Sequence, residues 1–289
     1  MEYIIDKEYA DVRLDRYLRK NFPDLALTEI FKGIRVGKIK VNGKKSKQNY
    51  RLQLGDVVKV FFNVEEKDRS EDIPEIDDKT INKVKKDIVY EDGNVLIFNK
   101  KPNVVMHKGS GHEFGISEII KAYLKNPDFN FVNRIDKATS GLVIGAKNLV
   151  TARELSEEIR ERNIDKKYYI VVNGRIDKKD FTVKSYLKKL EDRVVELEEY
   201  EPGAKESISR FRVIKSGKKY TLLEGTLGSG RTHQLRVQLA SMGHPILGDA
   251  KYGKEKGGTM FLFSYYLDIP KYGIKIELPI PEEYNRALA

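Results

Sequence analysis

Hydrophobic residues in the first 61 positions indicate two helices. In VRLDRYLRKNF, which begins at Val12, apolar residues recur at the spacing of one helix face, and most other positions carry charged residues, chiefly arginine and lysine. This pattern predicts an amphipathic helix with a basic outer face. A second helix is expected to follow, with the Thr28 hydroxyl as its N-terminal cap.

Strand patterns follow the two helices. KIKVNGKK alternates polar and apolar residues around Asn42-Gly43, which is a strong hairpin signal. Gly55-Asp56 predicts another turn before a valine-rich strand. Together with the helices, these patterns predict a small domain over residues 1–62.

Residues 63–87 are dense in charge and have little apolar periodicity. This composition favours an extended, solvated linker, with a helical strut as the alternative. From Ile88 the pattern changes to strands, and later segments mix strands such as YTLLEGTL with helices such as TARELSEEIRER, which Thr151 and Glu154 could cap as a box. We therefore expect an α+β protein whose larger domain covers residues 88–289.

Composition restricts the function classes. The 289 residues include no cysteine, which excludes disulfides, thiol nucleophiles, iron–sulfur clusters and cysteine-ligated zinc. Four histidines remain, and only His107 and His112 are close in sequence, so a metal site there is a weak alternative. No apolar run approaches the roughly 18–20 residues of a membrane span, and the acidic N-terminus differs from a signal peptide. A cytoplasmic protein is expected.

Positive charge is concentrated near the N-terminus. The net charge is +10, and residues 11–61 hold 13 Lys/Arg against 5 Asp/Glu, whereas residues 63–87 hold 6 against 9. A basic unit of this kind often binds a polyanion. Nucleic acid is the leading candidate.

The segment NRIDKATSGLVIGAKN, residues 133–148, contains candidate chemistry. If residues 132–136 form a strand, alternation places Arg134 and Asp136 on one face and Ile135 on the other. Ile135 would then pack inward while the charged pair faces a cleft. A surface ion pair, worth at most ~1 kcal/mol, is the alternative. LVIGAK is expected to be the next buried strand, with Gly141 in the turn before it.

Two further segments bear on that alternative. In IDKKYYIVV, alternation places Lys166, Tyr168 and Ile170 on one strand face.

The second segment covers residues 228–253. Thr232 could cap a helix there whose core stripe is Leu235, Leu239 and Met242. Arg236 lies about 100° from its neighbour Leu235 around such a helix, at the edge of the stripe, and should reach into a cleft. The glycines of the preceding GSG permit close backbone approach to a ligand.

Residues 11–61 closely resemble the S4 RNA-binding domain, a small αL-type module found in a ribosomal protein and several RNA-modifying enzymes. The resemblance implies a basic face that contacts the RNA backbone. The residues assigned to that face are Arg13, Arg16, Arg19, Lys32, Arg35 and Lys38.

Residues 88–285 resemble the catalytic domain of the RluA-type pseudouridine synthases, the family that contains the RluC- and RluD-like enzymes of large-subunit ribosomal RNA. The family pattern His-Arg-Leu-Asp-x-x-Thr-Ser-Gly appears as NRIDKATSG, and Lys-x-Tyr appears as KKY. Gly-Arg-Thr-His-Gln-Leu-Arg, with a following Gly-His-Pro-Ile-x-Gly-Asp, appears nearly unchanged at 230–249. The resemblance implies a mixed, largely antiparallel sheet and a structured RNA substrate.

The resemblance also implies roles for individual residues. Asp136 would be the nucleophile, Tyr168 would lie against the target base, and Arg236 would pair with Asp136 and keep it ionised. Arg134 would fill the space that a flipped uridine leaves, and Leu262 would line the uracil pocket. Further substrate contacts are expected from Lys166, Arg231, His233 and Gln234.

Three positions depart from the family pattern. Asn133 stands where histidine is usual, Asn103 replaces the glycine of Lys-Pro-x-Gly, and Phe263 occupies the histidine place of Leu-His-Ala. The first departure bears on contacts with the RNA backbone and leaves the carboxylate in place.

The implied reaction suits this inventory of residues. Uridine must lose its N–C glycosidic bond, rotate, and form a C–C bond to the same sugar. That requires a carboxylate, a dry pocket and a nearby cation, but no metal, thiol or redox cofactor. The base must first leave its stack. Attack on the ring, attack on the sugar and a glycal route all remain open, as does transfer RNA in place of ribosomal RNA. We expect a monomer with no membrane partner.

Two other functions compete with this interpretation. A non-catalytic RNA-binding assembly factor could use the same fold, but it would not require Asp136, Tyr168 and Arg236, which are all present. A metal-dependent nuclease would require clustered carboxylates at the site. The acidic run EDIPEIDD lies instead in the expected linker.

Overall fold

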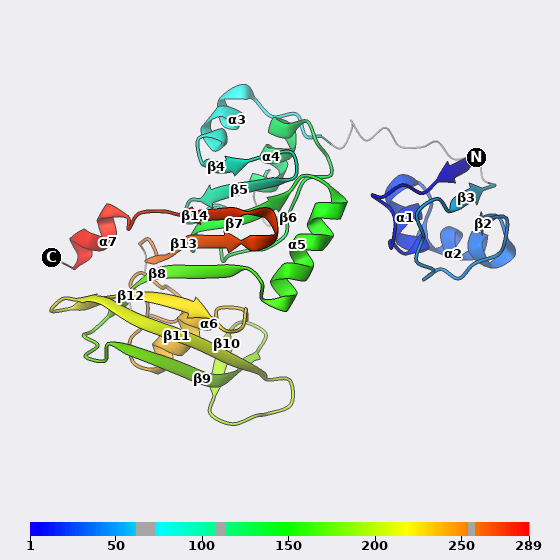
Figure 1. Cartoon of the computed structure of the whole chain (residues 1–289). Helices are drawn as coiled ribbons and strands as arrows, with labels where there is room; N and C mark the ends of the chain where they lie inside the picture. Colours follow the sequence, from blue (N-terminus) through cyan, green and yellow to red (C-terminus); the bar gives the residue numbers. More distant parts are fainter. Residues whose placement is uncertain (62–72, 108–113, 254–257, 289) are drawn as a thin grey trace.

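The computed structural model describes residues 1–61, 73–107, 114–253 and 258–288. They form a small N-terminal unit, residues 1–61, and a larger part from residue 73 onward around one extended sheet (Figure 1). We call this larger part the catalytic body, after the resemblance of residues 88–285 to a catalytic domain. No helix among the described residues is long and apolar enough to span a bilayer.

The N-terminal unit packs two helices on a three-stranded antiparallel sheet of order β1-β3-β2. Leu14, Leu18, Ile30 and Ile34 project from the helices into a core that is closed to solvent, which confirms the amphipathic pattern of the first helix. The elements are β1 (Glu2–Ile4), α1 (Leu14–Asn21), α2 (Leu27–Val36), β2 (Ile39–Val41) and β3 (Val57–Val60).

Two local predictions in this unit need correction. Thr28 does not cap the second helix, because α2 begins one residue earlier and the N–H of Ala26 donates to the Glu29 carboxylate (3.1 Å). Asn42-Gly43 does form a turn, with φ values of 51° and 74°. The segment after the turn pairs with β2 only through one antiparallel bridge, Val41 with Lys44, and the strand that pairs along β2 is β3.

The expected linker is wrong over part of its length. Residues 78–85 form α3 (Asp78–Lys85), whose cap is Asp77 accepting from the Thr80 N–H at 2.9 Å. The helical alternative is therefore correct here. Val84 packs against a buried cluster of the catalytic body that includes Ile116 and Ile120, so α3 belongs to that body.

The sheet of the catalytic body has the order β10-β9-β11-β12-β8-β13-β7-β5-β4, with β14 on β13 and β6 on β7. Its pairings are antiparallel except for β13 with β7. This confirms the α+β class and the largely antiparallel sheet. The strands are β4 (Ile88–Glu91), β5 (Val95–Lys100), β6 (Asn130–Phe131), β7 (Ser140–Ala146), β8 (Asp165–Asn173), β9 (Asp180–Lys189), β10 (Val194–Leu197), β11 (Lys205–Ser216), β12 (Tyr220–Leu227), β13 (Leu262–Ile269) and β14 (Ile274–Glu277).

Helices pack against parts of this sheet. α5 packs on β7, and α6 packs against β9, β10 and β11 (Figure 1). The cap of α5 is Asn148, which accepts from the Thr151 N–H (2.8 Å), so the expected box of Thr151 and Glu154 does not form. The helices are α4 (Ile116–Leu124), α5 (Leu149–Glu161), α6 (Gln234–Ser241), the 3-10 turn η2 (Pro270–Tyr272) and α7 (Glu282–Ala287).

The parallel contact between β7 and β13 depends on a glycine. Gly141 has a φ of 108°, and a Cβ atom there would lie 2.2 Å from the carbonyl oxygen of Ser264. Only glycine permits both the backbone conformation and this approach. The loop before β7 is thereby held at the centre of the sheet, beside β8 and β13.

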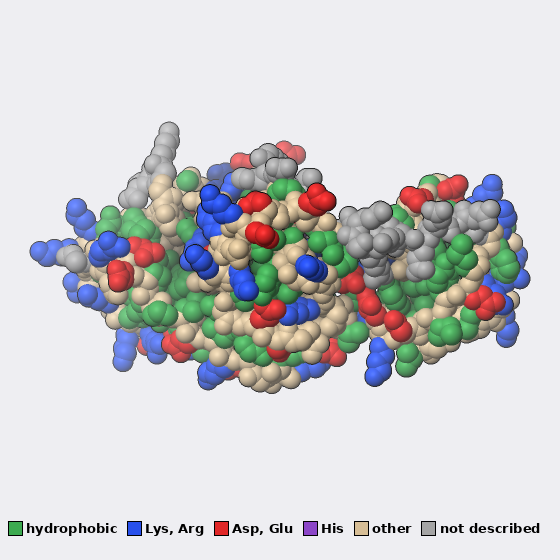
Figure 2. Space-filling view, turned by 90° about the horizontal axis from the view of Figure 1, so that it is seen from above, with side chains coloured by type: hydrophobic (Ala, Val, Ile, Leu, Met, Phe, Trp, Pro, Cys, Tyr) green, Lys and Arg blue, Asp and Glu red, His purple; other side chains and the backbone are tan. Residues whose placement is uncertain are grey.

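Charged side chains are unevenly distributed over the surface. On the face in Figure 2, lysines and arginines alternate with acidic side chains over the catalytic body and gather along the outer edge of the N-terminal unit. This agrees with the excess of basic residues counted for residues 11–61.

Candidate active site

Asp136 lies in an irregular loop between β6 and β7. The predicted strand over residues 132–136 is wrong, because β6 ends at residue 131 and a turn follows, in which the Thr139 N–H donates to the Asp136 carbonyl (3.1 Å). The expected orientations are correct in part. Ile135 is buried in an apolar cluster and Asp136 lines a cavity, but Ile135 also borders that cavity.

A guanidinium from α6 connects two carboxylates at this cavity. Arg236 donates from Nη1 to Oδ2 of Asp136 at 2.8 Å. Its other edge forms a fork with Asp249, from Nε to Oδ2 at 2.7 Å and from Nη2 to Oδ1 at 2.8 Å. The side chain of Asp249 is inaccessible to solvent, whereas that of Asp136 is 28% exposed. The fork fixes Arg236, and one nitrogen is left to hold Asp136.

The hydrogen bonds between Arg236 and Asp249 keep both side chains ionised. Burial alone would lower the pKa of Arg236, but its hydrogen bonds to Asp249 and Asp136 outweigh burial and raise that pKa. Burial would raise the pKa of Asp249, and the bonds from Arg236 outweigh it and lower the pKa. Because the fork keeps both partners ionised, the positive charge beside Asp136 does not depend on pH near neutrality.

His233 and Tyr252 enclose the guanidinium. The Tyr252 ring lies under Arg236, 5.1 Å from Cζ to the ring centroid, and its hydroxyl is 2.7 Å from Nδ1 of His233. Nε2 of His233 is 3.7 Å from Oδ2 of Asp136. Burial lowers the pKa of His233, which Asp136 only partly opposes. His233 is therefore neutral near pH 7 and contributes shape and polarity.

The start of α6 differs from the prediction. Thr232 does not cap the helix; His233 takes that position with a left-handed φ of 55°. The Gln234 side chain makes four internal hydrogen bonds, accepting from the Ser229 hydroxyl and the Arg231 N–H and donating to the Ser209 hydroxyl and the Ile208 carbonyl. These hydrogen bonds hold the loop before α6 in place, and Gln234 also lines the cavity.

The cavity has a volume of about 310 Å³, and part of its wall is formed by apolar side chains. Tyr168 and Leu262 form part of that wall, and burial raises the pKa of Tyr168 to about 12, so its hydroxyl stays neutral. Burial also lowers the pKa of Lys166 at the same cavity. Arg134, which is exposed, Arg231 and Asn133 complete the polar lining. The structure thus brings together residues from all three sequence motifs.

Lys100 is a buried cation near the site that sequence reasoning missed. Its side chain is closed to solvent, and Nζ donates to the carbonyls of Lys101 (2.9 Å), Val104 (3.2 Å) and Lys137 (2.8 Å). Burial lowers the pKa of Lys100 to about 8, although the charge of Asp136 opposes the shift. Lys100 therefore ties together the two loops that flank Asp136.

Two departures from the family pattern now have structural explanations. Asn103 has a left-handed φ of 63°, which asparagine and glycine adopt more readily than other residues, and its N–H also donates to the Lys137 carbonyl (2.8 Å). Asn133 accepts from the Ile144 N–H through Oδ1 (2.7 Å). Both asparagines hold the loop of Asp136 against its neighbours.

Asp249 and Tyr252 were also missed as site residues. Asp249 lies within the Gly-His-Pro-Ile-x-Gly-Asp motif, which was the available signal for it. Met242, by contrast, was placed in the core stripe of α6 but caps the helix with 38% exposure. In the described part of the chain no group of three or more histidine, aspartate or glutamate residues is placed to bind a metal, and His112 lies outside that part.

The six basic residues expected to contact RNA lie apart from the cavity, on and beside α1 and α2. Arg13 pairs with Asp15 at 2.6 Å. Arg16, Arg19, Lys32, Arg35 and Lys38 are exposed to solvent. Within the described residues, none of the six lines the cavity of Asp136.

Comparison with known proteins agrees with this geometry. Residues 94–241 match the family model described as RNA pseudouridylate synthase, and residues 12–58 match the S4 domain model. The chain is 35% identical over 254 residues to the protein named Ribosomal large subunit pseudouridine synthase C of Vibrio cholerae, covering 87% of this chain and 80% of that protein. A Buchnera aphidicola protein of the same name is 38% identical, covering 84% and 78%.

A solved structure shows the same fold. Human RNA Pseudouridylate Synthase Domain Containing 1 superposes with a TM-score of 0.59 at 25% identity, over 70% of this chain and 85% of that one. These similarities support an enzyme rather than a non-catalytic assembly factor. The chain therefore belongs to the RNA pseudouridylate synthase family, as an RNA pseudouridine synthase with an S4 domain at its N-terminus.

Proposed function

We propose that this enzyme converts specific uridines of large-subunit ribosomal RNA to pseudouridine, with Asp136 as the nucleophile. The observation that carries the proposal is the Asp136 carboxylate at the cavity, held by a guanidinium that Asp249 fixes from behind. The names of the relatives from Vibrio cholerae and Buchnera aphidicola support the choice of RNA.

The carboxylate is oriented for attack. Among the described residues, the contacts to the Asp136 carboxylate all involve Oδ2, through Arg236 and, at a longer distance, His233. Oδ1 is left for the substrate. The N–C bond breaks, the base rotates in the cavity, and a C–C bond forms at the same sugar carbon, so no atom is gained or lost. Attack on the ring, attack on the sugar and a glycal route all begin from this carboxylate.

The cavity wall suits a base that has left its stack. Tyr168 and Leu262 offer apolar surface to the face of a uracil, and the neutral Tyr168 hydroxyl adds no charge there. Arg134 is exposed at the cavity, where it could occupy the space the base vacates in the RNA. Enclosure in this pocket offsets part of the few kcal/mol that base flipping costs.

The test is site-by-site mapping of pseudouridine after incubating unmodified large-subunit ribosomal RNA with the enzyme. We expect conversion at a small number of defined uridines by the wild-type enzyme, and none by Asp136→Asn, because an amide is a poor nucleophile. Asp177→Asn, at a 79% exposed side chain far from the cavity, is the matched control.

Two outcomes would contradict the proposal. Conversion of transfer RNA alone would overturn the choice of substrate. Single-turnover conversion by Asp136→Asn at more than about a hundredth of the wild-type rate, a barrier change below ~3 kcal/mol, would show that Asp136 is not the nucleophile. Equal melting temperatures of wild type and Asp136→Asn establish that a loss of conversion in the variant does not result from unfolding.

A further inference from the structure

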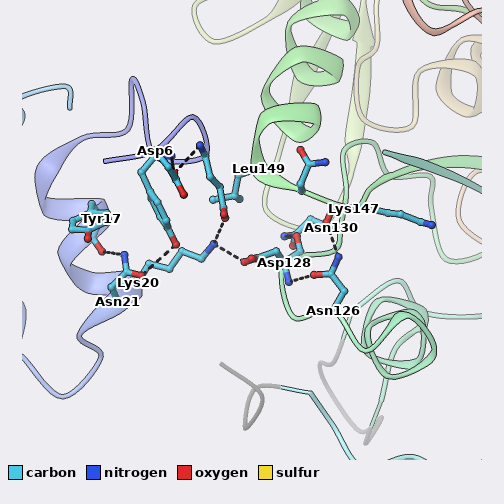
Figure 3. A network of polar contacts seen from close by, with 12 residues as sticks. Asp6, Tyr17, Lys20, Asn21, Asn126, Asp128, Asn130, Lys147 and Leu149 are labelled. Carbon is cyan, nitrogen blue, oxygen red and sulfur yellow. Dashed lines mark hydrogen bonds and ion pairs between the residues drawn. The ribbon is translucent and has the colours of Figure 1, made fainter. Parts of the chain in front are cut away.

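The N-terminal unit docks on the catalytic body at defined contacts (Figure 3). Lys20 Nζ lies 2.6 Å from Oδ1 of Asp128, and Leu149 of α5 packs against the core of the N-terminal unit. Arg153 of α5 donates to the carbonyls of Ala10 and Glu8 through its two terminal nitrogens. Because α5 supplies two of these contacts, it is the main docking element.

One face of α5 is directed toward the N-terminal unit. Its residues recur at the three- and four-residue spacing of a single helix face. They are Leu149, Ala152, Arg153, Ser156, Glu157 and Arg160.

The contacts named above involve only the first half of that face, Leu149 and Arg153. The whole face, from Leu149 to Arg160, lines an open cleft of about 740 Å³, to which the N-terminal unit contributes Arg13, Arg16 and Arg51. The cleft is therefore shared between the two parts of the chain, and each part contributes arginines to it.

The cleft is suited to an extended anion. Five arginines line it, against the two carboxylates of Asp11 and Glu157. Those carboxylates pair with Arg51 and Arg160 at sites where every partner is more than half exposed, and such pairs are weak. The Arg16 side chain forms no ion pair with any described residue. Guanidinium groups of this kind bind phosphate through two parallel hydrogen bonds.

The cleft also lies close to the catalytic cavity. Ile159, the neighbour of Arg160 in sequence, lines the cavity of Asp136. Side chains of neighbouring helix residues leave the axis about 100° apart, so the two sites adjoin the same C-terminal part of α5. A polynucleotide bound in the cleft could reach the cavity within a few nucleotides.

We propose that this cleft binds the sugar-phosphate backbone of the substrate RNA, with Arg16 and Arg51 on one side and Arg160 on the other. The N-terminal unit would then do more than tether RNA, because it completes a binding site that neither part has alone. The proposal rests on the proposed function for the identity of the RNA, and on the geometry of α5 for the location of the site.

The experiment measures binding of unmodified large-subunit ribosomal RNA to the full chain at several salt concentrations. The test variant carries Arg16→Gln and Arg160→Gln, one from each wall. The control carries Arg175→Gln and Arg286→Gln, two exposed arginines that line neither site. Arg286 lies on α7, away from the N-terminal unit (Figure 1).

We expect the test variant to bind at least tenfold more weakly at moderate salt. Its slope of log affinity against log salt should be shallower by about 1.4, since each lost phosphate contact on single-stranded RNA removes about 0.7. The control should match wild type in both measurements.

An unchanged affinity and slope in the test variant would overturn the proposal, as would a slope that falls equally in test and control variants. A slower chemical step with unchanged binding would also overturn it. This result can be told apart from a failure of the proposed function. If wild type forms no pseudouridine, but the cleft variant loses RNA binding and the control does not, then RNA binding in the cleft is supported and the assigned reaction is wrong.

Discussion

At the residue scale, the site depends on one guanidinium shared by two carboxylates of different exposure. Asp249 is closed to solvent and takes two of the hydrogen bonds of Arg236, while Asp136 takes one and faces the cavity. A buried charge is tolerated only when it is paired and hydrogen-bonded. The buried pair therefore serves as a rigid support for the exposed carboxylate.

Asp249→Asn should damage both stability and turnover. The fork to Arg236 would lose a charged partner, and breaking a buried pair costs about 3–5 kcal/mol. Arg236 would also be free to turn away from Asp136. We expect a lower melting temperature and, at a temperature where the variant is folded, a single-turnover rate reduced at least tenfold with RNA affinity near that of wild type.

Asp177→Asn provides the comparison for this substitution, because its partner Arg175 and the aspartate are both largely exposed. A rate for Asp249→Asn equal to that of this control would show that the fork does not position Arg236.

Lys100→Met should change how stability depends on pH. Burial lowers the pKa of Lys100 to about 8 in the folded chain from its ordinary 10.5. Between these values the unfolded chain holds the proton and the folded chain has released it, so this group makes the free energy of unfolding rise with pH. Below about pH 8 both states are protonated, and the full cost of burying the charge remains.

The measurement is urea unfolding of wild type and Lys100→Met at pH 7.5 and pH 10. The stability of wild type relative to the variant should increase by roughly 1–3 kcal/mol between the two pH values. Lys79→Met, at an exposed position of α3, is the control. A difference that stays constant, or that shrinks with rising pH, would contradict the assignment of a lowered pKa.

At the element scale, α5 has three different surroundings. Leu155 is buried in the catalytic body, Ile159 lines the cavity, and Leu149 and Arg153 contact the N-terminal unit. A single helix thus fixes the distance between RNA-binding and catalytic parts. That arrangement follows from its period, because residues three or four apart share a face.

Arg153→Ala should loosen the docking without unfolding either part. The carbonyls of Ala10 and Glu8 would lose their donors, while both cores stay intact. In hydrogen exchange, we expect amides of residues 8–14 to exchange several-fold faster, with no change in β7 or β8. Protection equal to that of Arg175→Ala would show that Arg153 does not secure the contact.

At the scale of the whole molecule, the excess positive charge and the cavity of Asp136 belong to different parts of the chain. The N-terminal unit holds most of the excess positive charge, and the cavity of Asp136 is formed by the catalytic body. The boundary between them falls earlier than the charge pattern indicates, because α3 packs on α4.

Removal of residues 1–72 should therefore weaken RNA binding and leave a folded catalytic body. The fragment 73–289 keeps α3 and its contacts with α4. We expect a shallower salt dependence of RNA affinity, because fewer phosphates are neutralised, and a cooperative melting transition. Binding as tight as that of the full chain, with an unchanged salt slope, would contradict this division of roles.

Much of the site was predictable from local sequence. The alternation in KKYYIVV correctly placed Lys166 and Tyr168 at one cavity, and the position of Arg236 beside Leu235 correctly directed it to a cleft. Ile135 is buried and Asp136 lines the cavity, as predicted, although the segment is not a strand and Ile135 also borders the cavity. Side-chain polarity selects burial even where the backbone is irregular.

Helix caps were less predictable. Thr28, Thr151 and Thr232 were each expected to cap or help cap a helix, and none does. A capping residue is selected by where the chain enters the helix, and that depends on tertiary packing as well as on the side chain. The helix over residues 78–85 was predicted only as the alternative to a linker, for a related reason. Its few apolar residues show no clear helical period, and packing against α4 stabilises the helix.

Periodicity predicted the α+β class and directed Asp136 and Arg236 toward a cleft. The two RNA-related modules and the pairing of Asp136 with Arg236 came from motifs that resemble known families. All of these signals are local properties of the chain. Three features are visible only in the folded chain: Asp249 holds Arg236, Lys100 secures the loop of Asp136, and arginines from both parts share one cleft. Each of these joins residues distant in sequence, and pairing across such distances depends on the packing of the sheet and of α5, which no local pattern specifies.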